Sequence, residues 1–203
     1  MSTQYNELSG RSVDRLRALA DGVFAIAMTL LVLDLRLPEG GAADDHELWS
    51  QLIGLGPQFA AFLLSFTMLG TFWLAEHTLL DRCTRSDRTL AWVCVLYLFF
   101  VSTLSFSAST LAEHVDLAVA VGLYWANLAG LGLTLAWQLW HVQRAGMVDD
   151  PESITLVRRR LVLAQGMYAA AALVSLVSPQ WSIVALAAVQ LFFVVSPRLP
   201  FRA

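Results

Sequence analysis

Two carboxylates frame an unusual apolar run near the start of the sequence. Asp21 and Asp34 enclose twelve residues, 22–33, that carry no charge. A helix of that length rises only about 18 Å, whereas the hydrocarbon core of a bilayer is about 30 Å thick. If this helix crosses a membrane, at least one carboxylate lies at membrane depth, where an ionisable group needs a partner and marks a functional site. Arg17 precedes Asp21 by four residues, so the two side chains form a candidate pair on one helical face.

A second set of polar residues stands near the end of the next apolar stretch. Trp73 and His77 are four residues apart, and the topology derived below places them at the same depth as Asp21. An ordinary interfacial anchor is one interpretation of such a Trp. The common depth also allows a polar network of Arg15, Asp21, Trp73 and His77 that braces the helices.

Nothing in the sequence is typical of an enzyme. There is no Gly-rich phosphate loop, no His and carboxylate set at metal-ligand spacing, and no activated Ser motif. Cys83 and Cys94 stand eleven positions apart without further ligands and are interpreted as ordinary residues. We therefore expect no catalytic activity, no metal or other cofactor and no nucleic-acid partner.

The composition indicates an integral membrane protein. Hydrophobic residues make up 57% of the 203 residues and charged residues only 14%, against about a quarter charged in an ordinary soluble domain. The predicted fold is all-α, with the whole chain, 1–203, forming one membrane domain surrounded by lipid.

Six apolar segments divide the chain into expected transmembrane helices. Pro57 is expected to kink or start a helix early in the second segment, and 143–160 is expected to be a polar connection. A secretory signal is the alternative for the first segment, but Asp34 and Arg36 interrupt it, so we keep it as a helix. The expected helices cover residues 13–36, 48–80, 89–111, 117–142, 161–177 and 180–195.

The arginines assign the two sides of the membrane. Six spans place twelve of the thirteen Arg residues on one side and only Arg36 on the other. Basic residues are retained on the cytoplasmic side of short loops. We therefore predict a multi-pass protein of the inner cell membrane with both termini in the cytoplasm.

A stripe of side chains on the first helix could line a pore. Ile26, Leu30 and Leu33 follow i, i+4, i+7 spacing and Thr29 is adjacent to them. Because this helix is apolar on every side, the residues alone leave two alternatives open, a pore wall or a surface that packs against lipid and other helices.

The first helix also carries a sequence signature. Residues 15–34, RLRALADGVFAIAMTLLVLD, resemble the first-helix signature of the transmembrane protein 175 family in its bacterial six-helix form. Shorter similarities extend over the rest of the chain. They are Ser65-Phe66, Trp73 with His77, Leu98-Phe99-Phe100, Phe106, Leu123-Tyr124, Asn127 and Ser178-Pro179.

This resemblance implies a potassium-permeable cation channel. It implies a homotetramer whose first helices line a central pore that conducts monovalent cations, chiefly potassium. The family's apolar constriction maps onto Ile26, Leu30 and Leu33, and Thr29 is the polar residue expected to face the ion path. Rings of such side chains dewet easily, which suits a gate or a size barrier.

The family's Arg and Asp map onto Arg15 and Asp21, but its Phe-Ser pair is replaced by Leu19 and Ala20. The replacement removes a hydroxyl and an aromatic ring from the network, and Arg17 is a candidate substitute. Two other hypotheses remain at this point. One is a proton-coupled secondary transporter in which Asp21 and His77 form a relay, and the other is a packing subunit without transport of its own.

Overall fold

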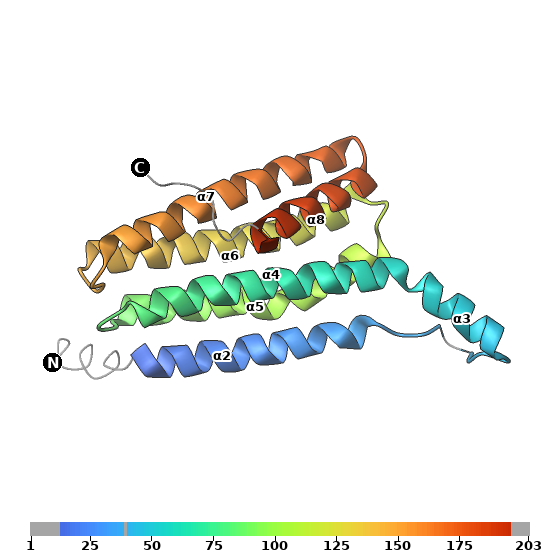
Figure 1. Cartoon of the computed structure of the whole chain (residues 1–203), viewed down its shortest axis with the longest axis horizontal. Coiled ribbons are helices and arrows are strands. Elements are labelled where there is room, and N and C mark those ends of the chain that lie inside the picture. Colours follow the sequence, from blue (N-terminus) through green and yellow to red (C-terminus); the bar gives the residue numbers. More distant parts are fainter. Residues whose placement is uncertain (1–12, 39, 196–203) are drawn as a thin grey trace.

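Long helices form nearly the whole of the computed structural model, which describes residues 13–38 and 40–195 (Figure 1). Within these ranges every named element is a helix. In chain order they are α2 (Val13–Leu30), the 3-10 turn η1 (Leu31–Asp34), α3 (Asp45–Gly54), α4 (Gly56–Asp81), α5 (Arg88–Glu113), α6 (Ala118–Arg144), α7 (Pro151–Leu173), the 3-10 turn η2 (Val174–Leu176) and α8 (Pro179–Val195).

Local residue chemistry determines where several helices begin. The Asp44 carboxylate accepts the Glu47 N–H at the start of α3, and the Asp87 carboxylate accepts the Leu90 N–H at the start of α5. These side chains satisfy backbone donors that have no partner within their helix. Proline, which lacks an N–H and fits the first turn, stands near the start of α4 and opens α7 and α8.

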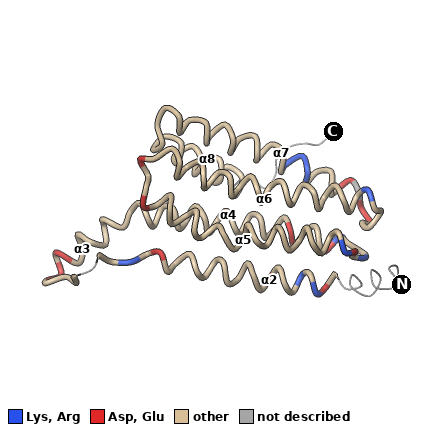
Figure 2. Tube along the Cα trace, turned by 180° about the vertical axis from the view of Figure 1, so that it is seen from behind, with Lys and Arg blue, Asp and Glu red and all other residues tan. Residues whose placement is uncertain are grey.

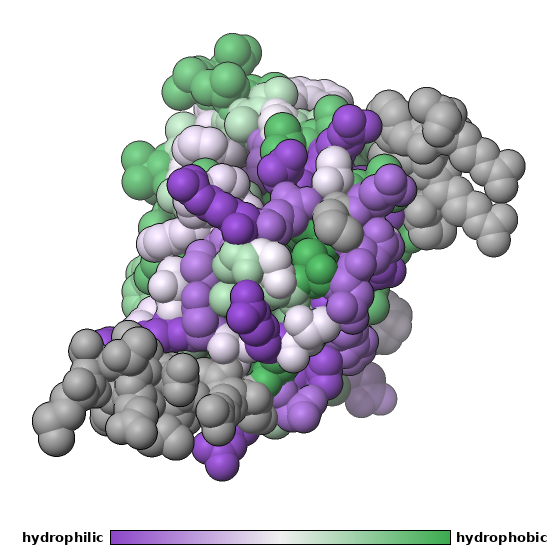
Figure 3. Space-filling model, turned by 90° about the vertical axis from the view of Figure 1, so that its left-hand side faces the viewer, coloured by the Kyte–Doolittle hydropathy of each residue, from purple (hydrophilic) through white to green (hydrophobic). Residues whose placement is uncertain are grey.

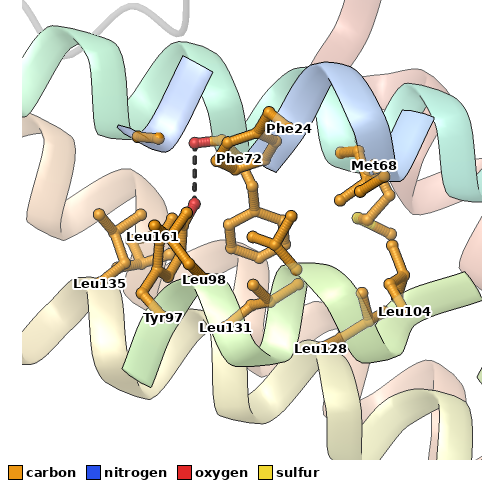
Figure 4. Close-up of a cluster of buried hydrophobic side chains, with 14 of the residues drawn as sticks. Phe24, Met68, Phe72, Tyr97, Leu98, Leu104, Leu128, Leu131, Leu135 and Leu161 are labelled. Atoms are coloured by element: carbon orange, nitrogen blue, oxygen red, sulfur yellow. Dashed lines mark hydrogen bonds between the residues drawn. The ribbon is translucent and has the colours of Figure 1, made fainter. Parts of the chain in front are cut away.

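The long helices run side by side as a bundle, and α3 projects away from it at one end (Figure 1). Helix α2 packs against α4 and α5, α5 against α6, and α6 against α7, while α8 contacts α7 and α4. The close-up in Figure 4 shows the core between these helices. There the Tyr97 hydroxyl donates to the carbonyl oxygen of Phe72 at 3.0 Å, and the Tyr97 ring packs near that of Phe24.

Two expected helices differ from those observed. The stretch 48–80 divides at Leu55 into α3 and α4, because Pro57 begins a new helix there. The fifth helix begins at Pro151, so the expectation of a polar connection through residue 160 was wrong. Asp150 caps that helix through the N–H groups of Glu152 and Ser153. Arginine is a good helix former, so the basic residues 158–160 continue the helix.

Within the described residues, four helical segments are long and apolar enough to cross a membrane. They are Val13–Asp34, Gly56–Asp81, Arg88–Glu113 and Ala118–Arg144. Helix α8 is apolar but shorter, and α7 carries three consecutive arginines in its first half.

Charges separate between the two ends of the bundle. Most arginines of the described chain gather where α2 and α5 begin and α4 and α6 end, and those of α7 lie in its first half. Arg36, after η1, lies toward the other end (Figure 2). The arginine-rich end, viewed along the bundle, exposes mainly hydrophilic residues (Figure 3). Acidic side chains dominate the opposite end, in α3 and in the turn between α5 and α6.

Candidate functional site

One face of α2 is left uncovered by the rest of the chain. Ile26, Leu30 and Leu33 are 60%, 47% and 55% exposed. Thr29 is also exposed, and its hydroxyl donates to the carbonyl oxygen of Ile26 at 2.8 Å. We call these four residues, of which Leu33 lies in η1, the α2 stripe.

The opposite face of α2 is the one that packs into the bundle. Ala20, Phe24, Ala27 and Leu31 repeat at three- and four-residue intervals, and all four are buried. The Phe24 ring lies 5.9 Å from that of Tyr97. The helix is therefore held by one apolar face, and an equally apolar stripe faces out of the subunit.

A polar contact attaches α2 to α4 near the arginine-rich end. The indole Nε1 of Trp73 donates to Oδ1 of Asp21 at 2.8 Å. The same indole stacks on the ring of His77, with ring centres 5.3 Å apart. The structure thus brings together three of the four residues named for the bracing network, Asp21, Trp73 and His77.

The arginine of this region pairs differently from the expected arrangement. Arg17 bonds Asp14 and Asp81, each at 2.9 Å, and the carbonyl oxygen of Leu80 at 3.1 Å. The expected Arg17–Asp21 pair is therefore wrong, because Asp81 at the end of α4 takes the guanidinium. Arg15 lies on the exposed side of α2.

Sequence reasoning did not name Asp81 as part of this network. Its Oδ2 lies 3.1 Å from Nε2 of His77, four residues earlier on α4. This i, i+4 spacing of a base and an acid was a readable signal. The resulting chain of contacts, Asp21–Trp73–His77–Asp81–Arg17, begins and ends on α2 and is called the α2–α4 latch below.

The first-helix carboxylate at the other end lies in a different environment. Asp34 lines a pocket together with Arg36, Gln58, Ser109 and Glu113, between η1, α4 and α5. In the described residues no group of three or more His, Cys, Asp or Glu side chains is arranged to hold a metal ion.

Comparison with known proteins finds relatives that are named as potassium channels. A family model for the endosomal/lysosomal potassium channel TMEM175 matches residues 15–104, from the first turns of α2 into α5. A protein of Streptomyces collinus named as a potassium channel is 36% identical over 141 residues, 68% of each chain. A potassium channel of Chamaesiphon minutus is 31% identical over 175 residues, which are 81% of this chain and 84% of that protein.

The chain belongs to the TMEM175 family. A crystal structure described as a lysosomal potassium-selective channel TMEM175 homologue from Chamaesiphon minutus superposes with a TM-score of 0.81 and 25% identity. The superposition covers 92% of this chain and 98% of that one. TMEM175 proteins are ion channels, so the family resemblance and the expectation of a non-enzyme are both confirmed. The relatives are named as channels, which does not favour the transporter hypothesis.

The two departures from the TMEM175 signature lie on different faces of α2. Leu19 is exposed on the side of the α2 stripe, and Ala20 is buried against the bundle. At Leu19 the aromatic ring is therefore missing from the uncovered face of α2. At Ala20 the hydroxyl is missing from the packed face. The latch forms without that hydroxyl, because Trp73 donates directly to Asp21.

Proposed function

We propose that the chain is the subunit of a homotetrameric, potassium-permeable cation channel in which the α2 stripe lines a central pore. The observation that carries the proposal is the uncovered apolar stripe opposite the packed face of α2. The names of the relatives support potassium as the permeant ion. The function needs monovalent cations, surrounding lipid and three further copies of this chain, and no cofactor.

Six membrane spans are consistent with the helix lengths. Helix α8 has 17 residues and rises about 25 Å, close to the thickness of a thin hydrocarbon core. Helix α7 with η2 extends from Pro151 to Leu176, and its arginines lie toward the arginine-rich end. There they can reach lipid headgroups while the remaining apolar turns cross the membrane.

The separation of charge supports an orientation. With the arginine-rich end in the cytoplasm, as basic residues require, α2 enters the inner cell membrane from inside and α8 returns to that side. Both termini are then cytoplasmic. The α2–α4 latch lies at the inner end of the pore helix and the acidic end faces outward.

The α2 stripe suggests how conduction is controlled. Side chains of Ile26, Leu30 and Leu33 from four subunits form apolar rings that exclude water when narrow and so close the path. The Thr29 hydroxyl donates its hydrogen bond to the carbonyl oxygen of Ile26. The lone pairs of the hydroxyl oxygen are then free to coordinate a partly dehydrated cation. The latch fixes the rotation of α2 against α4 and thereby keeps the stripe on the pore axis.

Potassium flux into liposomes that contain the purified full chain tests this function. Ile26→Asn should raise the flux about tenfold or more, because a ring of amides lowers the dewetting barrier and about 1.4 kcal/mol is worth tenfold in rate. Leu133→Asn is the matched control, since Leu133 is exposed on α6 away from the stripe. No cation flux in the wild type, or equal flux in wild type and Ile26→Asn, would contradict the proposal.

A further inference from the structure

Glu76 is a carboxyl group of α4 that the proposed ion path does not use. Its side chain is 1% exposed, inside the contact between α4, α5 and α6. Trp73 and His77 belong to the latch with α2, whereas Glu76 contacts Cys94 of α5 and Gln138 of α6. A carboxyl group buried this completely needs partners that balance it.

The partners of Glu76 are weak or incomplete. Its Oε1 accepts the thiol of Cys94 at an Sγ to oxygen distance of 3.6 Å, and its Oε2 has no hydrogen-bond partner. Gln138, beside it, is 0% exposed, and neither its Nε2 nor its Oε1 has a partner. Buried polar groups are almost always hydrogen-bonded. The Gln138 amide N–H can donate to Oε2 of Glu76, but Oε1 of Gln138 still lacks a donor, which an ionised carboxylate cannot supply.

No positive charge compensates this carboxyl within the described chain. No Arg or His nitrogen of the described residues forms an ion pair with it, and the Arg17 guanidinium bonds Asp14 and Asp81 instead. On α4 itself, His77 pairs with Asp81.

The remaining titratable groups around Glu76 are neutral. The hydroxyl of Tyr97, on α5, donates a hydrogen bond to the carbonyl oxygen of Phe72. Burial raises the pKa of Cys83, in the loop after α4, to about 11. Both therefore stay protonated near neutrality, together with the Cys94 thiol that donates to the carboxyl.

We propose that Glu76 is an internal proton-binding site, occupied at neutral pH and separate from the ion path. An isolated carboxylate in such surroundings costs several kcal/mol. The acid form costs far less, because its O–H supplies the missing donor and can reach Oε1 of Gln138. The ligand of this site is a proton, and its occupancy joins α4 to α6 by a hydrogen bond.

The proton bound at Glu76 stabilises the folded chain, and the size of this stabilisation depends on pH. Enclosed without a cation, the carboxyl is accommodated in the folded chain as the acid, whereas water solvates the carboxylate of the unfolded chain. Its contribution is therefore complete at acidic pH and declines as the pH rises.

Infrared spectroscopy of the full-length protein in lipid bilayers tests the site directly. The wild type at pH 7 should show the C=O stretching band of a protonated carboxyl, shifted by deuterium exchange. Glu76→Gln should lack that band, and Glu152→Gln, which changes an exposed Glu at the start of α7, should retain it. A wild-type spectrum without the band, or a Glu76→Gln spectrum that retains it, would overturn the proposal.

A second measurement covers the case in which Glu76→Gln does not fold. Gln138→Leu keeps the carboxyl and removes its acceptor, so the same band should move to the higher frequency of a weaker hydrogen bond. Where Glu76→Gln folds, its thermal midpoint should gain several degrees on the wild type between pH 5 and pH 9. An unmoved band in Gln138→Leu, or a midpoint difference that is constant with pH, would contradict a proton site.

Discussion

At the scale of single residues, one hydrogen bond joins Asp21 of α2 to the α4 side of the latch. Nε1 of Trp73, on α4, donates a hydrogen bond to the Asp21 carboxylate at 2.8 Å. A half-buried carboxylate that loses such a donor loses a charge-assisted hydrogen bond, which is among the stronger ones in proteins. The indole also stacks on His77, so it contacts both Asp21 of α2 and the next residue of the latch on α4.

Trp73→Phe should lower the stability of the folded chain by about 1.5 kcal/mol, the lower end of the range for a bond to a charged group, because Asp21 is partly solvated. The change removes the N–H and leaves a smaller aromatic ring beside His77. Thermal unfolding in detergent measures it. Trp92→Phe is the control, because Trp92 is exposed on α5. Equal shifts in both variants would show that the Asp21 bond contributes nothing.

The sequence predicted which side chains form this cluster better than it predicted which of them pair with each other. Asp21, Trp73 and His77 were named from their common depth, and the structure places them in contact. Arg17 was assigned to Asp21 because spacing along one helix is visible in a sequence. Its contact with Asp81, across 64 positions, depends on how α2 lies against α4, which spacing cannot give.

At the scale of helices, α5 and α6 form a close contact that depends on glycine. A Cβ added at Gly130 would lie 2.4 Å from the ring of Phe100, nearer than atoms pack. Glycine permits this approach of two helices in lipid, where association depends on packing of small residues.

Gly130→Ala should therefore destabilise the bundle by about 1–3 kcal/mol, the cost of overpacking a filled contact. Gly122→Ala, on the same helix, meets no atom within 4 Å of the new Cβ and should be neutral or slightly stabilising. Thermal midpoints of the two variants measure the difference. A Gly130→Ala midpoint as high as that of Gly122→Ala would mean that the Phe100 ring moves aside without cost.

Apolar stretches and turn residues gave the approximate positions of most helices. The start of α7 was missed because its arginines resembled a loop, although Asp150-Pro151 is a typical helix start. The break at Leu55 between α3 and α4 was implied by Pro57, but the direction in which α3 departs depends on tertiary contacts.

At the scale of the whole molecule, hydropathy cannot distinguish a pore from a lipid surface. The α2 stripe is apolar, and so are exposed residues of α6 such as Leu133 and Val119. The first-helix resemblance, more than any periodicity, was the reason to assign the stripe to an axis. Only contacts between copies of the chain separate the two alternatives.

Cysteine cross-linking distinguishes them in the assembled protein. Leu30→Cys should form disulfide-linked dimers on oxidation in membranes, because residues that meet around an axis can bring Cα atoms within the 4.4–6.8 Å that a disulfide requires. Leu133→Cys, equally apolar and 71% exposed, should remain monomeric on a non-reducing gel. The native Cys83 and Cys94 are buried and free, so they provide little background. If Leu30→Cys stays monomeric under every oxidant, or Leu133→Cys dimerises as readily, the stripe faces lipid and a different surface must line the pore.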